Sequence, residues 1–167
     1  AAAAPAAVTG DLTDLTVTAP LTGKAIPLSE VKDPIFSGGT LGPGAAIVPT
    51  SGHVVSPVDG EVIVAFPTGH AYGLRSASGV EILIHVGMDT VQLGGKHFQA
   101  KVKVGQRVRR GDLLAEVDLA GVAAAGYDTT TPVVVTNAKA YQRVDLTARG
   151  PVATGDQFLT AVAPATV

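Results

Sequence analysis

The stretch VEILIHV, residues 80–86, decides the fold class of this chain. Strict alternation along it places four β-branched side chains on one face: Val80, Ile82, Ile84 and Val86. The opposite face carries Glu81, Leu83 and His85. The pattern predicts a strand whose β-branched face packs in the core and whose His85 points outward. The outward Leu83 beside this histidine indicates a surface used for contact with another molecule.

Short apolar runs recur on both sides of this strand, among 20 glycines and 11 prolines. Runs rich in valine, isoleucine, leucine and threonine predict strands over residues 15–18, 46–48, 61–66, 113–117 and 132–136. Only residues 119–125 have a helical pattern, and that segment is short. Many brief strands with turns between them predict an all-β protein, an antiparallel sandwich or barrel with only short helical segments.

Two weak internal sequence repeats indicate a duplicated β unit. APLTGKAI (19–26) resembles SPVDGEVI (56–63), with a proline three residues before a glycine in both. GQRVRRGDLLAEV (105–117) and PVATGDQFLTAV (151–162) both place Gly-Asp before an apolar strand. Either repeat alone is compatible with chance in a glycine-rich β protein. Together they favour a duplicated unit closed on itself.

A predicted hairpin brings a second histidine to His85. The segment before the strand turns around Ser78 and returns as residues 80–86. With a two-residue loop, paired positions add up to 155, which sets His70 opposite His85 on one face of the sheet. Two facing imidazoles suit metal binding, general acid/base chemistry or phosphoryl transfer through a phosphohistidine. Spacing alone leaves these open, together with an unrelated pair of surface histidines.

The bulk composition bounds the class of protein. A length of 167 residues suits one domain, and 46% hydrophobic residues can fill its core. A net charge of −2 gives no indication of nucleic-acid binding, and no apolar run approaches the roughly 18 residues of a spanning helix. The absence of cysteine excludes disulfides and fits a cytoplasmic protein. We expect residues 1–12 to be a disordered extension or a cloning remnant, and residues 13–167 to form the domain.

Eight motifs in order carry a resemblance to a known family. They are APLTG (19–23), AIVPT (46–50), SPVDG (56–60), TGHAY (68–72), SGVE (78–81), IHVGMDTV (84–91), GQRVRRGD (105–112) and TPVVVTN (131–137). From Val17 to Val162 the chain resembles the glucose-type enzyme IIA family of bacterial sugar phosphotransferase systems. The resemblance implies a compact antiparallel β-sandwich. It also implies a cytoplasmic phosphotransferase component that takes a phosphoryl group from the histidine phosphocarrier protein and passes it to the IIB domain of a sugar permease.

Carried over residue by residue, the resemblance also implies roles for individual side chains. The phosphorylated histidine of the family falls on His85 and its second active-site histidine on His70. Thr68 matches the threonine that hydrogen-bonds around that second imidazole, and the carbonyl of Gly87 is where the family orients the nucleophilic ring. The residues that match the acidic and apolar docking surface are Asp33, Phe36, Phe66, Leu83, Asp89 and Val91.

The resemblance implies that no cofactor is required. In some members a zinc ion bridges the two active-site histidines, here His70 and His85, to a carboxylate of a bound target. Zinc, regulated transporters and kinases are therefore expected only in a regulatory role, for a monomer that binds no nucleic acid and does not insert into the membrane. Pro34, Ile35 and Gly73 depart from the usual pattern of the docking surface, which bears on the choice of partner.

The alternative from another class is a zinc-dependent peptidase of related duplicated β architecture. Such an enzyme needs an H-x-H pair with a further histidine and an aspartate as ligands, and the chain has no H-x-H. A biotinyl or lipoyl carrier domain needs a lysine at a hairpin tip, and neither Lys96 nor Lys101 occupies one. His53 and His97 match no family site and are expected to be solvated loop histidines.

Overall fold

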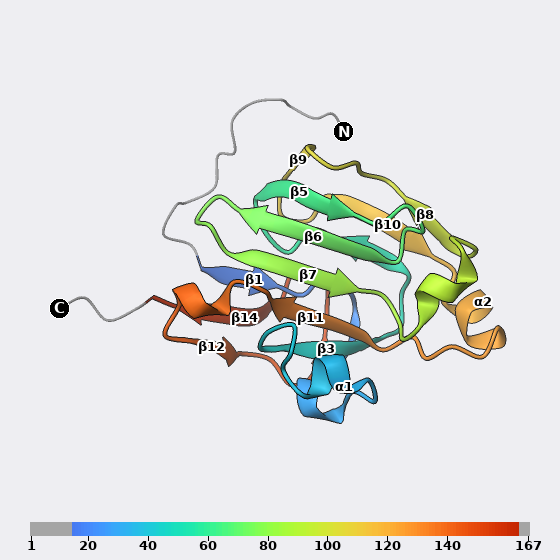
Figure 1. Ribbon diagram of the computed structural model, residues 1–167, viewed down its shortest axis with the longest axis horizontal. Helices are drawn as coiled ribbons and strands as arrows, with labels where there is room; N and C mark the ends of the chain where they lie inside the picture. The colour runs from blue at the N-terminus through green and yellow to red at the C-terminus, as the bar shows by residue number, and fades with distance from the viewer. Residues whose placement is uncertain (1–14, 164–167) are drawn as a thin grey trace.

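The computed structural model describes residues 15–163, which form three antiparallel sheets (Figure 1). The largest contains, in spatial order, β13 (Gly150–Val152), β2 (Gly23–Pro27), β3 (Gly44–Pro49), β11 (Thr131–Val135), β7 (Glu81–His85), β6 (Ala71–Ser76), β5 (Gly60–Ala65) and β9 (Arg107–Val108). Two smaller sheets contain β1 (Thr16–Thr18), β14 (Gln157–Val162) and β12 (Arg143–Leu146), and β4 (His53–Val55), β10 (Leu113–Val117) and β8 (Phe98–Ala100). The strands of the described residues stay in open sheets and do not close into a barrel, so of the two expected architectures the packed sheets are confirmed.

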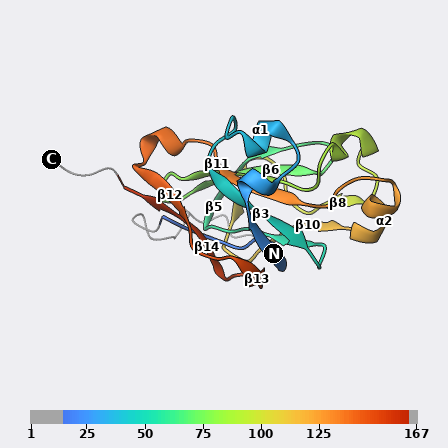
Figure 2. The same cartoon turned by 90° about the horizontal axis from the view of Figure 1, so that it is seen from below.

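Helical structure is confined to short segments outside the strands. These are α1 (Pro34–Ser37), α2 (Leu119–Ala124) and three 3-10 turns, η1 (Leu28–Glu30), η2 (Thr90–Leu93) and η3 (Ala138–Ala140). Figure 2 shows α1 on one side of the strands and α2 at one end. Within residues 15–163, no helix is long and apolar enough to cross a membrane. The expected extension over residues 1–12 lies outside the described residues.

The alternation predicted for residues 80–86 is present in β7. Val80, Ile82, Ile84 and Val86 are at most 1% exposed and belong to the main core cluster. Glu81, Leu83 and His85 are partly exposed on the other face. The prediction of a buried core face and an outward face that carries His85 is therefore confirmed. The contact role of the outward face stays a prediction.

The register predicted for the β6–β7 hairpin is wrong by one residue. Ala71, not His70, pairs with His85, so paired positions add up to 156. The loop has three residues because Ser76 N–H donates to Val80 O at 2.8 Å and Gly79 closes the turn at φ +97°. A three-residue loop with a left-handed glycine is a common hairpin connection that the sequence alone did not distinguish from a two-residue loop.

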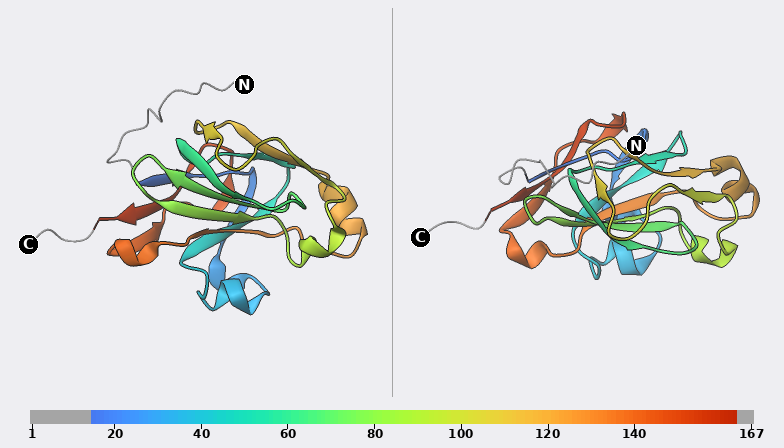
Figure 3. Two further views of the ribbon diagram at one scale, coloured as in Figure 1. Left: turned by 45° about the horizontal axis from the view of Figure 1, so that its top comes forward. Right: turned by 90° about the horizontal axis from the view of Figure 1, so that it is seen from above.

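The two sequence repeats correspond to a structural duplication. Ala19 N–H donates to Asp156 O at 2.7 Å, and Ser56 N–H donates to Asp112 O at 2.8 Å. In return, Gly155 N–H donates to Ala19 O at 3.0 Å, and Gly111 N–H donates to Ser56 O at 2.8 Å. Each half therefore makes the same pair of contacts between its proline-containing turn and its Gly-Asp hairpin. The first and last strands, β1 and β14, run side by side in Figure 3 and pair antiparallel.

The segment from η1 through α1 covers part of the outer face of the large sheet. A second apolar cluster forms beneath it and consists of Leu28, Val31, Phe36, Ala46, Met88 and Val134. Helix α1 begins where the Asp33 carboxylate accepts a hydrogen bond from Ile35 N–H at 3.0 Å, with Pro34 in its first turn. Helix α1 lies beside His85, the last residue of β7.

Candidate functional site

The imidazole of His85 is oriented by the backbone turn that follows β7. Its Nδ1 lies 2.7 Å from the carbonyl oxygen of Gly87. A carbonyl oxygen only accepts, so Nδ1–H is the donor. In the neutral ring Nε2 is then the unprotonated nitrogen. Gly87 reaches this geometry at φ +80°, in the left-handed region that favours glycine.

His70 lies just before β6, in a turn that removes it from the alternation of the strand. Gly69 has φ +74°, and His70 O accepts a hydrogen bond from Val86 N–H at 2.7 Å. The side chain is 2% exposed, with its Nδ1 2.6 Å from Thr68 Oγ1. Aromatic rings enclose it: Phe66 at a centroid distance of 5.1 Å and Phe98 at 6.5 Å.

The two imidazoles lie together although their predicted pairing register is wrong. The ring centroids of His70 and His85 are 5.0 Å apart and the planes meet at 79°. The left-handed turn at Gly69 precedes β6, so strand alternation no longer decides where the His70 side chain points. The expected proximity of the two rings is therefore present in the structure.

Burial makes both imidazoles poor bases. Burial, and to a lesser degree the neighbouring His85, lowers the pKa of His70 from 6.5 to about 4. Burial also lowers the pKa of His85, while the Gly87 carbonyl and the carboxylates of Asp33 and Asp89 oppose that shift. Both rings are therefore expected to be neutral at pH 7. A neutral imidazole offers one lone pair and one N–H, which suits a nucleophile beside a hydrogen-bond donor.

The residues expected on the docking surface divide into exposed and buried ones. Phe66 is 41% and Val91 49% exposed, Leu83 and Asp33 are partly exposed, and Asp89 is exposed. Phe36 is only 3% exposed, so its expected place on the surface is corrected. Its side chain points from α1 into the second apolar cluster, with its ring centroid 5.1 Å from that of His85.

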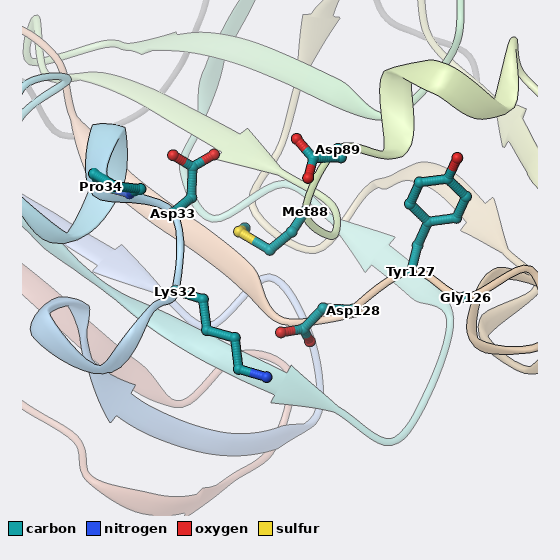
Figure 4. A pocket seen from close by; sticks show the side chains of 8 residues that line it. All are labelled: Lys32, Asp33, Pro34, Met88, Asp89, Gly126, Tyr127 and Asp128. Carbon is teal, nitrogen blue, oxygen red and sulfur yellow. The ribbon is translucent and has the colours of Figure 1, made fainter.

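An open pocket of about 530 Å³ lies between α1 and the turn after β7 (Figure 4). Its lining consists of Lys32, Asp33, Pro34, Met88, Asp89, Gly126, Tyr127 and Asp128. Three carboxylates from three separate segments border it, so negative charge predominates beside His85. Sequence reasoning did not identify Asp128 or Phe98 near the site. Neither lies in a recognisable motif for the site. Asp128 reaches it because β11 pairs with β7, whereas Phe98 lies on β8, in a separate sheet.

The remaining histidines lie apart from the pair. His53 is exposed on β4. The Nδ1 atom of His97 is 3.5 Å from the Asp118 carboxylate, next to α2. Within residues 15–163 no group of three or more histidine, cysteine, aspartate or glutamate side chains could hold a metal ion. The described residues therefore supply no complete ligand set of the kind a zinc peptidase needs.

Known proteins resemble this chain over most of its length. It is 47% identical over 132 residues to the glucose-specific EIIA component of Bacillus cereus, covering 79% of this chain and 80% of that protein. It is 49% identical over 143 residues to the beta-glucoside-specific EIIBCA component of Halalkalibacterium halodurans, covering 86% of this chain. The chain spans only 22% of that longer relative.

The fold has a solved counterpart as well. The structure of glucose permease IIA from Mycoplasma capricolum matches with a TM-score of 0.80 and 40% sequence identity, covering 88% of this chain and 94% of that one. The family model described as phosphoenolpyruvate-dependent sugar phosphotransferase system, EIIA 1, matches residues 15–141. The chain therefore belongs to this EIIA family of the sugar phosphotransferase system.

Proposed function

We propose that this chain accepts a phosphoryl group on Nε2 of His85 from the histidine phosphocarrier protein and passes it to the IIB domain of a sugar permease. The observation that carries the proposal is the 2.7 Å hydrogen bond from His85 Nδ1 to Gly87 O. This bond commits one ring nitrogen to the backbone and leaves the other as the nucleophile, beside a second imidazole at 5.0 Å between ring centroids.

The transfer is a displacement at phosphorus. The lone pair of His85 Nε2 forms a new N–P bond, while the bond between phosphorus and the donor imidazole breaks and its electron pair returns to that imidazole. His85 Nδ1 keeps its proton and its bond to Gly87. The onward step repeats this displacement with the IIB acceptor as nucleophile. Phosphoryl transfer depends mainly on in-line positioning and on stabilising charge at the phosphoryl oxygens.

His70 supplies that stabilisation in this proposal. We assign the Thr68 hydroxyl as donor to His70 Nδ1 across their 2.6 Å contact, which places the His70 proton on Nε2. That N–H is then available to a phosphoryl oxygen on His85. The exposed side chains of Phe66 and Val91 form the apolar rim, and Asp33 and Asp89 suit basic residues on the protein partners.

Reconstitution tests the proposal. The chain is incubated with phosphoenolpyruvate, enzyme I and the histidine phosphocarrier protein, and acid-labile, base-stable phosphate is measured. We expect phosphate on the wild type, none on His85→Ala, and unchanged labelling of the control His53→Ala, whose imidazole is exposed on β4. His70→Ala should accept phosphate but fail to pass it to a IIB domain. Full labelling of His85→Ala would refute the assignment of the nucleophile, and undiminished donation by His70→Ala would refute the role of His70.

The remaining expectations belong to the same proposal. The chain acts as a monomer in the cytoplasm, and the transfer requires no cofactor. The described residues provide at most two imidazole ligands for zinc, His70 and His85, so a zinc ion there would need a carboxylate from a bound target such as a regulated transporter or kinase. Measuring the affinity for such a target with and without zinc and phosphorylation tests this regulatory part separately.

A further inference from the structure

The Gly87–Met88 peptide unit is held at both ends. Its carbonyl accepts from His85 Nδ1 at 2.7 Å, and its N–H, on Met88, donates to Asp128 O at 2.9 Å. Because the C=O and the N–H belong to one planar unit, fixing the N–H fixes the direction of the carbonyl. A hydrogen bond to the N–H also polarises the unit and strengthens the carbonyl as an acceptor.

The Asp128 backbone is in turn fixed by its own side chain. Oδ1 of Asp128 accepts from Thr130 N–H at 2.9 Å and from the Thr130 hydroxyl at 2.8 Å. These two bonds close a local turn immediately before β11. The turn directs the Asp128 carbonyl toward Met88 N–H, and Figure 4 shows Asp128 beside the segment that carries Met88 and Asp89.

Packing leaves the peptide unit little room to turn. A methyl group placed on Gly87 would lie 2.5 Å from Thr90 Cγ2 and 2.8 Å from Asp128 O. Thr90 is fully buried, and its hydroxyl donates to Val86 O at 2.5 Å. The unit is therefore confined between Thr90 and the Asp128 turn.

We propose that Asp128 is a positioning residue for phosphoryl transfer: its carboxylate holds the turn that fixes the Gly87–Met88 peptide unit, and so sets the tautomer and orientation of His85. The inference rests on the proposed function of His85. It assigns to Asp128 the role of a hydrogen-bond acceptor, not of a charge that attracts a partner.

Two substitutions separate these roles. Asp128→Ala removes both bonds to Thr130, whereas Asp128→Asn removes the charge and keeps an oxygen acceptor at the same place. We expect the alanine variant to lose the preference of His85 for the Nδ1–H tautomer, seen in the ¹⁵N shifts of the ring, and to accept phosphate about five- to tenfold more slowly. The asparagine variant should retain the wild-type tautomer and a rate within about twofold of wild type.

Asp156 provides a matched control away from the site. Its carboxylate accepts from Ala153 N–H at 2.8 Å, and its carbonyl accepts from Ala19 N–H at 2.7 Å. Asp156→Ala therefore also removes a carboxylate that holds a local turn, and it should change neither the His85 ring signals nor the rate. Should Asp128→Ala not fold, Thr130→Val, which removes only the hydroxyl donor, should shift the tautomer in the same direction by a smaller amount.

Two results would overturn the inference. One is a folded Asp128→Ala protein with wild-type ¹⁵N shifts for His85, or, where that protein does not fold, a Thr130→Val protein with those shifts. The other is an asparagine variant as slow as the alanine variant, which would assign Asp128 to charge. The ring signals are measured without any partner protein. A failure of phosphorylation in the wild type would therefore refute the proposed function and leave the tautomer result standing.

Discussion

Replacing Gly87 by alanine tests the backbone geometry that orients His85. The residue has φ +80°, and an L-residue in the left-handed region is destabilised by roughly 1–2 kcal/mol. The new methyl group would also meet Thr90 Cγ2 at 2.5 Å and Asp128 O at 2.8 Å. Overpacking of this kind destabilises by roughly 1–3 kcal/mol. We expect Gly87→Ala to lower the free energy of unfolding by about 2–5 kcal/mol.

A glycine with similar φ and free space around it separates the two contributions. Gly150 has φ +75°, and a methyl group there would have no neighbour within 4 Å. Gly150→Ala should therefore lose only the backbone part, about 1–2 kcal/mol. Urea unfolding of the wild type and both variants measures the difference, provided that the slopes agree. Equal losses at the two positions would refute the reasoning, because they would mean that Thr90 and Asp128 yield without resistance.

The same substitution has an expected effect on function. At a temperature at which Gly87→Ala remains folded, its carbonyl should be displaced from His85 Nδ1, and phosphate acceptance should slow by about tenfold or more. Gly150→Ala should accept phosphate at the wild-type rate. A folded Gly87→Ala protein that accepts phosphate as fast as wild type would show that the Gly87 carbonyl does not need this position.

Three other substitutions test the remaining contacts. Tyr72→Phe removes a buried hydroxyl without a hydrogen-bond partner in residues 15–163. Urea unfolding should therefore show an unchanged free energy of unfolding or one raised by up to about 1 kcal/mol. A lowered free energy of unfolding would show that the hydroxyl has a hydrogen-bond partner. Burial and His85 lower the pKa of His70 from 6.5 to about 4. Between these two pH values the unfolded chain binds more protons than the folded chain, so the free energy of unfolding should fall by about 2 kcal/mol from pH 7 to pH 5. The loss of unfolding free energy from pH 7 to pH 5 should be smaller by that amount in His70→Asn. Identical pH profiles of stability for the two proteins would contradict the lowered pKa of His70. Thr68→Val removes the hydroxyl 2.6 Å from His70 Nδ1, so donation to IIB should slow by about tenfold while acceptance stays near wild type; unchanged donation would contradict the tautomer assigned to His70.

The strand β7 was predictable because β-branched alternation and burial agree in it. Other strands were predictable as short apolar runs bounded by turn residues. The predicted strand over residues 113–117 coincides with β10, and the helix expected over residues 119–125 ends one residue earlier, at Ala124. Shorter strands such as β9, with two residues, contain no period from which they could be predicted. They exist because a neighbouring strand offers hydrogen-bonding groups at that edge, here β5 for β9.

The site was predictable in its two histidines and less so in their surroundings. His85 followed from the alternation of one strand, and the predicted hairpin brought His70 to it. The resemblance to enzyme IIA added Thr68 and the roles of both histidines. That Phe36 is buried depends on α1 folding back over β11 and β3, a tertiary contact that no local pattern encodes. Asp128 is 43 residues from His85 in the sequence, and only the pairing of β11 with β7 brings its turn to Met88.

The electrostatics of the site favour onward transfer in the proposed cycle. In the unphosphorylated chain, burial lowers the pKa of both imidazoles, so the nucleophilic lone pair is present at pH 7. A phosphoryl group on His85 would bring close to two negative charges. These raise the proton affinity of His70 and strengthen its hydrogen bond to the phosphoryl oxygens. Asp33 and Asp89 act in the opposite direction, because their carboxylates repel the bound phosphoryl group. A group held by one imidazole and repelled by two carboxylates remains ready to leave. The same two carboxylates suit basic residues of a protein that docks to receive it.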